Sequence, residues 1–275
     1  MTRSVRLAAL TLGCAAGTLL AQTPEEPQLV FSLAAGIAAG RGSQWSLTRQ
    51  PVQVLVQGST ELDTLGVGRY LRPGIALALG ATYYRSRHLG FTAEAGYFGV
   101  ASEQRCTPPM VFKTDAEEKN RVACAAMQGA HVQTSLVGFL AGITFRLAPA
   151  GRVQPYARLI GGVGLLASSF VRSDATIQFS SCQLAGNVCT IVFVDGESTP
   201  EAALLASLAA GATFEFSSGY RFRFEARDLV VALPVPAGNA NSANALAPVE
   251  RRWRHTPVFT AGLDVVLERR RGRRY

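Results

Sequence analysis

Eight charged side chains stand at alternating positions within otherwise apolar stretches of this sequence. Four are acidic and four are basic, so a set that faces one enclosed space can form ion pairs. On the same face they are accompanied by Gly, Ser and Thr, whereas the opposite face is almost wholly Leu, Ile, Val, Ala and Phe. The pattern predicts a lumen charge network inside a narrow barrel, made of Glu94, Arg146, Arg158, Glu215, Arg223, Glu225, Arg227 and Asp264.

The histidines offer little catalytic chemistry. His131 and Ser135 are four residues apart, which in a strand is about 13 Å and too far for a hydrogen bond. His255 is followed by Thr256 on the opposite face, and His88 lies at the end of its strand where the turns are short. We therefore expect no catalytic site and no enzyme activity.

The cysteines indicate disulfides more than metal ligation. Cys106, Cys124, Cys182 and Cys189 lack CxxC spacing and have no histidine nearby, so no metal site is predicted. The glycine run at 161–164 matches neither phosphate-loop nor dinucleotide patterns, so no cofactor is expected. With Cys14 removed in the predicted signal peptide, four cysteines remain, and an even number in an exported chain predicts two disulfides, Cys106–Cys124 and Cys182–Cys189, the second closing a hairpin.

The N-terminus has the layout of an export signal. Arg3 and Arg6 precede an apolar run that starts at Leu7, and Ala21 lies just before a plausible cleavage site at Gln22. Residues 1–21 are thus predicted to be a signal peptide. The alternative is a lipoprotein signal that ends at Cys14.

The elements that must position these residues are strands, because apolar and small or polar residues alternate with a period of two. Outside residues 7–21 no uninterrupted apolar run reaches 18 residues, so no membrane-spanning helix is predicted. No amphipathic helix is expected either. The eight predicted strands are 28–40, 68–84, 88–101, 131–146, 153–172, 202–217, 221–235 and 254–268.

Short and long connections alternate along the chain. Short links occupy 85–87, 147–152 and 218–220, and long ones occupy 41–67, 102–130, 173–201 and 236–253. This layout predicts an all-β fold over residues 22–269, a closed antiparallel eight-stranded transmembrane β-barrel with short periplasmic turns and long extracellular loops. A basic periplasmic tail, 270–275, would follow. A ten-stranded barrel is the alternative, because 52–57 could form a further strand.

The aromatic residues favour a membrane barrel over a soluble barrel with a polar exterior. They gather on the apolar face near the short turns, where a girdle at one membrane interface belongs. Asp228 alone breaks this face and requires either an interfacial position or a bulge. The predicted girdle consists of Phe31, Tyr83, Phe91, Phe145, Phe214, Phe216, Phe222 and Phe224.

With these features the chain resembles the small eight-stranded outer-membrane barrel proteins of the OmpA/OmpX type, without a periplasmic domain. The last strand also matches that family's assembly signal at Thr260, Gly262, Val265 and Leu267. The chain departs from the family by continuing past this strand to Tyr275. The resemblance implies a monomer in the bacterial outer membrane, with outer-membrane lipid, lipopolysaccharide and the assembly machinery as partners and no nucleic acid.

The expected function follows from a lumen filled by side chains. An eight-stranded barrel is just wide enough to be filled, and Phe98 and Leu136 add bulk to the charges, which excludes a wide porin. We expect a structural or surface-binding role through the extracellular loops, for a ligand not yet known. The alternatives are a narrow channel for small or hydrophobic solutes and, behind it, a lipid A-modifying enzyme. The three-residue link 218–220 further predicts that Glu215 faces Arg223.

Overall fold

The structure is a computed structural model that describes residues 27–52, 63–108, 117–166, 170–178, 188–194, 201–238 and 248–267. The predicted signal peptide and the basic tail lie outside these residues, as do 53–62 of the first long connection. No helix in the described ranges is long and apolar enough to cross a membrane.

Eight antiparallel strands close into a ring, which confirms the predicted barrel. Each strand pairs with the next in the order given below, and the last pairs back with the first. Closure leaves no unpaired edge within the barrel wall. The ring consists of β1 (Gln28–Ala38), β4 (Gly74–Tyr84), β5 (Leu89–Thr107), β6 (His131–Arg146), β7 (Val153–Leu166), β10 (Glu201–Ser217), β11 (Tyr220–Pro236) and β12 (Val249–Leu267).

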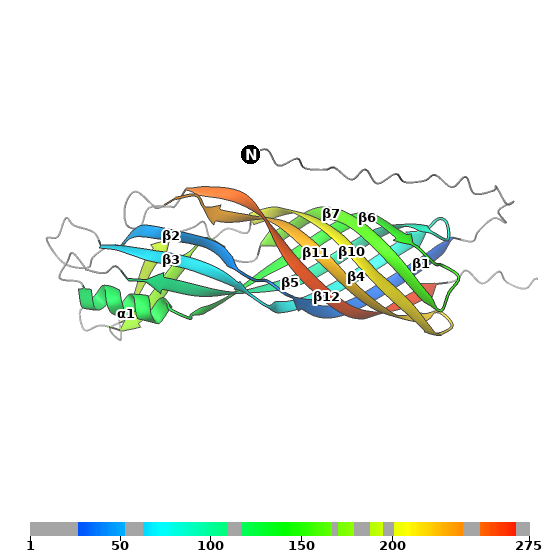
Figure 1. The fold of residues 1–275 in the computed structure, drawn as a ribbon, viewed down its shortest axis with the longest axis horizontal. Coiled ribbons are helices and arrows are strands. Elements are labelled where there is room, and N and C mark those ends of the chain that lie inside the picture. The colour runs from blue at the N-terminus through cyan, green and yellow to red at the C-terminus, as the bar shows by residue number, and fades with distance from the viewer. Residues whose placement is uncertain are drawn as a thin grey trace, which may run out of the picture.

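The wall continues beyond the ring at one end. β2 (Ser43–Val52) pairs with β3 (Asp63–Arg72), and β3 pairs with the outer half of β5. The sheet therefore holds ten strands, but the alternative of a ten-stranded barrel is wrong because only eight close the ring. In Figure 1 these two strands extend to the left, past the barrel.

Pro73 divides the predicted strand 68–84 into two. Arg72 pairs with Ala101 and Ala76 pairs with Phe98, so the register against β5 changes by one residue across the proline. Proline has no N–H to donate to the ladder, and strands tolerate it at such irregularities. The break marks where the barrel ends and the extension begins.

The long connections contain structure that the sequence pattern only partly revealed. β8 (Ser173–Gln178) pairs with β9 (Val188–Val194), which confirms the predicted hairpin. The expectation of no helix is wrong, because α1 spans Glu117–Met127. Its buried face, Asn120, Ala123, Cys124 and Met127, has helical spacing but contains one polar residue and few large apolar ones.

The outside of the barrel is a band of exposed large apolar side chains. Leu33 and Leu208 each expose 64% of their surface, which in water would carry a steep hydrophobic cost and in lipid carries none. All eight residues of the predicted aromatic girdle are exposed, so this prediction is confirmed. A lipid-crossing strand needs about 9–11 residues. β5, β11 and β12 are 19, 17 and 19 residues long and therefore run well past the membrane (Figure 1).

At some glycines of the wall, the backbone of the neighbouring strand lies too close to leave room for a Cβ atom. A Cβ added at Gly162 would lie 1.9 Å from the carbonyl oxygen of Phe139, whereas one at the adjacent Gly161 would meet nothing nearer than 3.5 Å. We predict that Gly162→Ala destabilises the barrel by about 1–3 kcal/mol and that Gly161→Ala is nearly neutral. Urea unfolding from lipid vesicles measures both. Equal losses in the two variants would contradict this packing.

Candidate functional site

The centre of the lumen is crossed by a layer of buried ion pairs. Arg227 reaches both carboxylate oxygens of Glu94, and Arg158 donates to Glu94 at 2.9 Å. Glu225 lies 2.7 Å from Arg227, 3.3 Å from Arg223 and 3.4 Å from Arg158. β5 and β11, which carry Glu94 and Arg227, stand opposite each other in the ring, so their ion pair spans the lumen.

The layer is electrically neutral. Its three arginines face Glu94, Glu225 and also Asp264, whose Oδ1 lies 3.8 Å from Arg223. The hydroxyl of Tyr156 donates to Glu225 at 2.7 Å. Three positive and three negative charges buried together avoid the several kcal/mol that one uncompensated buried ion would cost.

Hydroxyl groups continue this layer around the wall. Thr82, Thr92 and Thr144 form a chain with oxygen separations of 2.9 and 2.7 Å, and Arg158 donates to Thr144 at 3.2 Å. At the turn end of the lumen, Arg146 donates to Gln28. These contacts link β4, β5, β6 and β7 beside the ionic layer, and β6 and β1 near the turns.

The outer half of the lumen is mainly apolar, with the buried hydroxyls of Thr134, Ser207 and Thr256 among its side chains. Side chains from opposite walls meet there and are almost fully buried, among them the predicted plugs Phe98 and Leu136. The other large members are Leu140, Ile160, Leu166, Phe170, Leu205, Leu229, Val231, Leu233 and Val258. Two layers of side chains of different chemistry therefore cross the lumen, one ionic and one mainly hydrophobic.

Above this plug the extended wall builds a packed structure that we call the cap. It consists of β2, β3, the outer half of β5, α1, β8 and β9, with the outer end of β11 beside them (Figure 1). Its core is a separate cluster of buried, mostly apolar side chains beyond the apolar band of the barrel. The core residues are Trp45, Leu47, Leu65, Val67, Cys106, Ala123, Cys124, Met127, Val171, Ala175, Ile177, Ile191, Phe193, Val194 and Val235.

Buried polar contacts hold the elements of the cap in register. The indole N–H of Trp45 donates to the carbonyl of Phe170 at 2.9 Å, and Asn120 in α1 donates to Asp63 in β3 at 2.7 Å. Arg69 donates to the carbonyl of Arg172. Burial lowers the pKa of Arg69 to about 10, which leaves it charged at neutral pH.

The disulfide Cys106–Cys124 is present and joins β5 to α1, as predicted. Cys182 lies outside the described residues, and so does the side chain of Cys189, so the second predicted disulfide stays a prediction.

The predicted pairing of Glu215 with Arg223 is wrong. Seven of the eight predicted lumen charges are buried, but Glu215 is exposed at the rim and faces Arg221 at 3.5 Å. Arg223 faces Thr213 instead. Arg221, buried beside the rim, was the charged lumen residue that the pattern missed, although it shares the alternation of Arg223.

The turn explains this error. Ser217 pairs with Tyr220, so the link has two residues, and Gly219 adopts the positive φ of 81° that such a turn requires. A register shift between Glu215 and Ser217 then moves every later pair.

Asp228 lies on the outer face because no register shift occurs near it. Its carboxylate is 2.6 Å from Nδ1 of His255 on the neighbouring strand, and both side chains are exposed. The adjacent outward positions, Val230, Trp253 and Pro257, carry no hydroxyl nucleophile. This settles the position of Asp228 without creating a catalytic triad there.

The remaining histidines are not assembled into a site in the described part of the chain. His131 faces Glu103 and Ser135 faces Gly99, four positions apart on β6. Nδ1 of His88 lies 2.8 Å from the carbonyl oxygen of Arg146 in a short turn. No group of three or more His, Cys, Asp or Glu residues is placed to hold a metal ion among the described residues.

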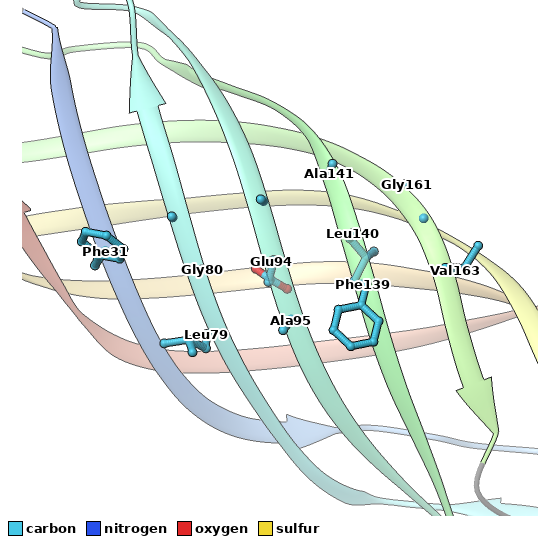
Figure 2. Close-up of a pocket in the computed structure, with 13 residues that line it drawn as sticks. Phe31, Leu79, Gly80, Glu94, Ala95, Phe139, Leu140, Ala141, Gly161 and Val163 are labelled. Atoms are coloured by element: carbon cyan, nitrogen blue, oxygen red, sulfur yellow. The ribbon is translucent and has the colours of Figure 1, made fainter.

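A hollow of about 570 Å³ lies on the outer wall, lined by residues of β1, β4, β5, β6 and β7. Figure 2 shows Phe31, Leu79, Phe139 and Val163 around it. Its floor is made of small residues, Ala81, Ala93, Ala95, Ala141 and Gly161. Glu94 borders it from behind but is engaged in the lumen layer. The surface it offers to the membrane is therefore suited to hydrocarbon.

The chain was compared with known proteins at the level of sequence and of fold. No protein-family model and no curated protein sequence matches it. Among solved structures, the outer membrane protein OprG from Pseudomonas aeruginosa has a TM-score of 0.45 and 10% identity, covering 87% of this chain and 96% of its own. Neisserial surface protein A has a TM-score of 0.39 and 12% identity, covering 88% and 99%. The outer membrane protease OmpT from Escherichia coli has a TM-score of 0.36 and 11% identity, covering 90% and 99%.

These similarities concern the fold alone, and a fold hosts many functions. The predicted resemblance to small eight-stranded outer-membrane barrels is confirmed at that level, by the closed ring of strands and its apolar exterior.

The charge layer generates a prediction about stability. Glu94→Gln and Arg227→Gln should each cost about 3–5 kcal/mol, because each leaves a buried charge unbalanced. The double variant keeps two positive and two negative charges in the layer and should cost clearly less than the sum. Glu215→Gln at the exposed rim is the control and should cost at most about 1 kcal/mol. Urea unfolding from lipid vesicles gives all four values, and strict additivity would show that the two residues are not coupled.

The disulfide Cys106–Cys124 generates a prediction about the stability of α1. Replacing Cys106 and Cys124 by Ser should loosen α1 by about 3 kcal/mol on the chain-entropy argument while the barrel stays folded. Brief trypsin treatment, followed by mass spectrometry, should then find cleavage at the exposed Arg121 that is slow in the oxidised protein. The barrel is followed by its heat-dependent gel mobility. Unchanged cleavage after the substitution would mean that packing alone holds the helix.

Proposed function

We propose that this chain is an integral protein of the bacterial outer membrane, closed to solutes, that presents its cap at the cell surface in a structural or surface-binding role. One observation carries the proposal: two layers of side chains cross the lumen, while β3 and the outer ends of β5 and β11 extend into a structured region beyond the barrel. A transport path would call for the opposite arrangement.

The two layers argue against permeation for different reasons. The gap left within the ionic layer, between Tyr156, Arg158 and Arg223, has a volume of about 10 Å³ and holds about one water molecule. An ion that crossed it would have to break buried pairs worth several kcal/mol each. The mainly apolar layer above offers a passing ion only the hydroxyls of Thr134, Ser207 and Thr256, too few groups to replace its hydration shell.

The cap supports the binding part of the proposal through its rigidity. Its elements share a core and are joined by buried hydrogen bonds and a disulfide. A surface that is already ordered loses little conformational entropy when a ligand binds. Catalysis is not part of the proposal, since the histidines of the described chain are not paired with a nucleophile.

Several features belong to the proposal as expectations. Residues 1–21 act as the export signal, and residues 270–275 form a periplasmic tail. The assembly machinery reads Thr260, Gly262, Val265 and Leu267, and the protein works as a monomer surrounded by outer-membrane lipid and lipopolysaccharide. Of these four residues, Gly262 has a packing role too, because a Cβ there would lie 2.3 Å from the carbonyl oxygen of Leu33.

Single-channel recording in planar lipid bilayers tests the closed lumen. The wild-type protein should show no steady open events. Leu136→Ala with Leu205→Ala should also stay silent, because the ionic layer below remains intact. Adding Glu94→Ala and Arg227→Ala to that pair should permit flickering openings. Steady conductance of the wild type would favour the narrow channel instead.

A further inference from the structure

The outward face of the extended wall carries a groove of about 450 Å³ where β3 lies between β2 and β5. Ser46, Gly68 and Arg105 are directly opposite one another across the three strands, and Gly66 faces Thr107. Because the middle strand presents glycines at these positions, backbone forms the floor and the side chains of the two outer strands form the walls. The groove is thus produced by strand register and not by a mobile loop.

One wall carries an arginine that is held in position. The guanidinium of Arg105 lies 4.0 Å from the ring centre of Tyr70, a cation–π contact, and its Nε is 3.7 Å from Glu103. Glu103 also accepts a hydrogen bond from Arg72 at 2.6 Å, and this bond, more than any other cause, lowers the pKa of Glu103. The three charged residues together carry one net positive charge, which faces the groove.

The other wall carries an arginine that a bulge has turned outward. The register between β2 and β3 shifts between Leu47 and Gln50, so that Thr48 and Arg49 are both exposed, although neighbours in a regular strand point to opposite faces. Within the described residues Arg49 has no carboxylate partner. Two strand spacings, about 10 Å, separate this wall from that of Arg105. A bound anion of sugar size can therefore reach both guanidinium groups.

The remaining lining groups define the ligand further. Hydroxyls from Ser46, Thr48, Thr64 and Thr107 line the groove, and Tyr70 offers part of its ring. Guanidinium groups recognise phosphate through paired hydrogen bonds, and hydroxyls with an aromatic face suit the hydroxyl and C–H groups of a sugar. The combination matches a saccharide that bears phosphate groups better than a peptide or a lipid chain.

The position of the groove indicates where such a saccharide comes from. It lies on the face of the wall that, further down, is in contact with lipid, and Tyr70 is five residues, about 17 Å along the chain, beyond the exposed Ile75 of the apolar band. We propose that the groove binds the phosphorylated core saccharide of lipopolysaccharide that stands beside the barrel in the same leaflet. This inference rests on the proposed function only in placing the cap at the outer surface.

Isothermal titration calorimetry of the folded full-length protein, in a detergent without a sugar head group, tests the proposal. The probe is lipid-free, phosphorylated core oligosaccharide from lipopolysaccharide. Binding is expected, and it should weaken about tenfold for each of Arg49→Gln and Arg105→Gln. Arg41→Gln with Arg251→Gln is the matched control, since it removes two exposed arginines outside the groove. Thr64→Phe should also weaken binding, by narrowing the groove without changing its charge.

The comparison ligands separate the sources. The same oligosaccharide after dephosphorylation, and neutral maltoheptaose, should bind at least tenfold more weakly. The proposal is overturned if the wild type does not bind the probe, or if the control pair loses as much affinity as the groove variants. A preference for a sulfated heparin oligosaccharide over the core oligosaccharide would overturn the assignment to lipopolysaccharide. None of these results depends on the conductance of the lumen.

Discussion

The ion pair between Glu94 and Arg227 spans the lumen, and both side chains are almost fully buried. A charge buried at that depth is costly unless an opposite charge lies beside it, and here the opposing charges come from four strands, β5, β7, β11 and β12. Each partner has to arrive at the same depth from a different part of the chain. The register of β5, β7 and β11 is therefore coupled through the charges as well as through the backbone ladder.

The surroundings of that layer follow from the solvent on each side. Outside, lipid makes no demand for polar groups, so residues such as Leu33 and Leu208 are exposed. Toward the turns, the guanidinium of Arg146 donates a hydrogen bond to the side chain of Gln28 near the rim of the barrel. Toward the cap, the lumen is filled by apolar side chains such as Phe98 and Leu136 in place of ion pairs. Beyond them lies the separate hydrophobic core of the cap.

The cap shows how one sheet can serve two environments. Leu65 and Val67 of β3 point into the cap core, while Gly66 and Gly68 between them leave the outer face hollow. The same alternation that hides charge inside the barrel thus hides apolar residues inside the cap. The bulge in β2 adds an exposed arginine to this hollow face. The groove proposed as a binding surface is thus a product of strand geometry.

The sequence by itself determined the class of the fold, because a period of two and the confinement of charges to one face admit few other arrangements. It also determined seven of the eight charges predicted for the lumen, the outward-facing aromatic residues and the Cys106–Cys124 disulfide, all of which are local or nearly local properties. Only the tertiary structure decided that Glu215 faces Arg221. A register changes by one residue with a two-residue turn or a bulge, and the alternation of residues is the same in either case.

The cap could not be predicted from the sequence for a related reason. α1 is short and polar, and its burial depends on β5, which precedes it in the chain, and on β3 and β8, which are more distant. The contact of Trp45 with Phe170 joins residues 125 positions apart. Periodicity and composition indicate whether each face of a segment prefers an apolar or a polar environment. The segment that packs against that face is decided by closure of the whole barrel, which brings these segments together.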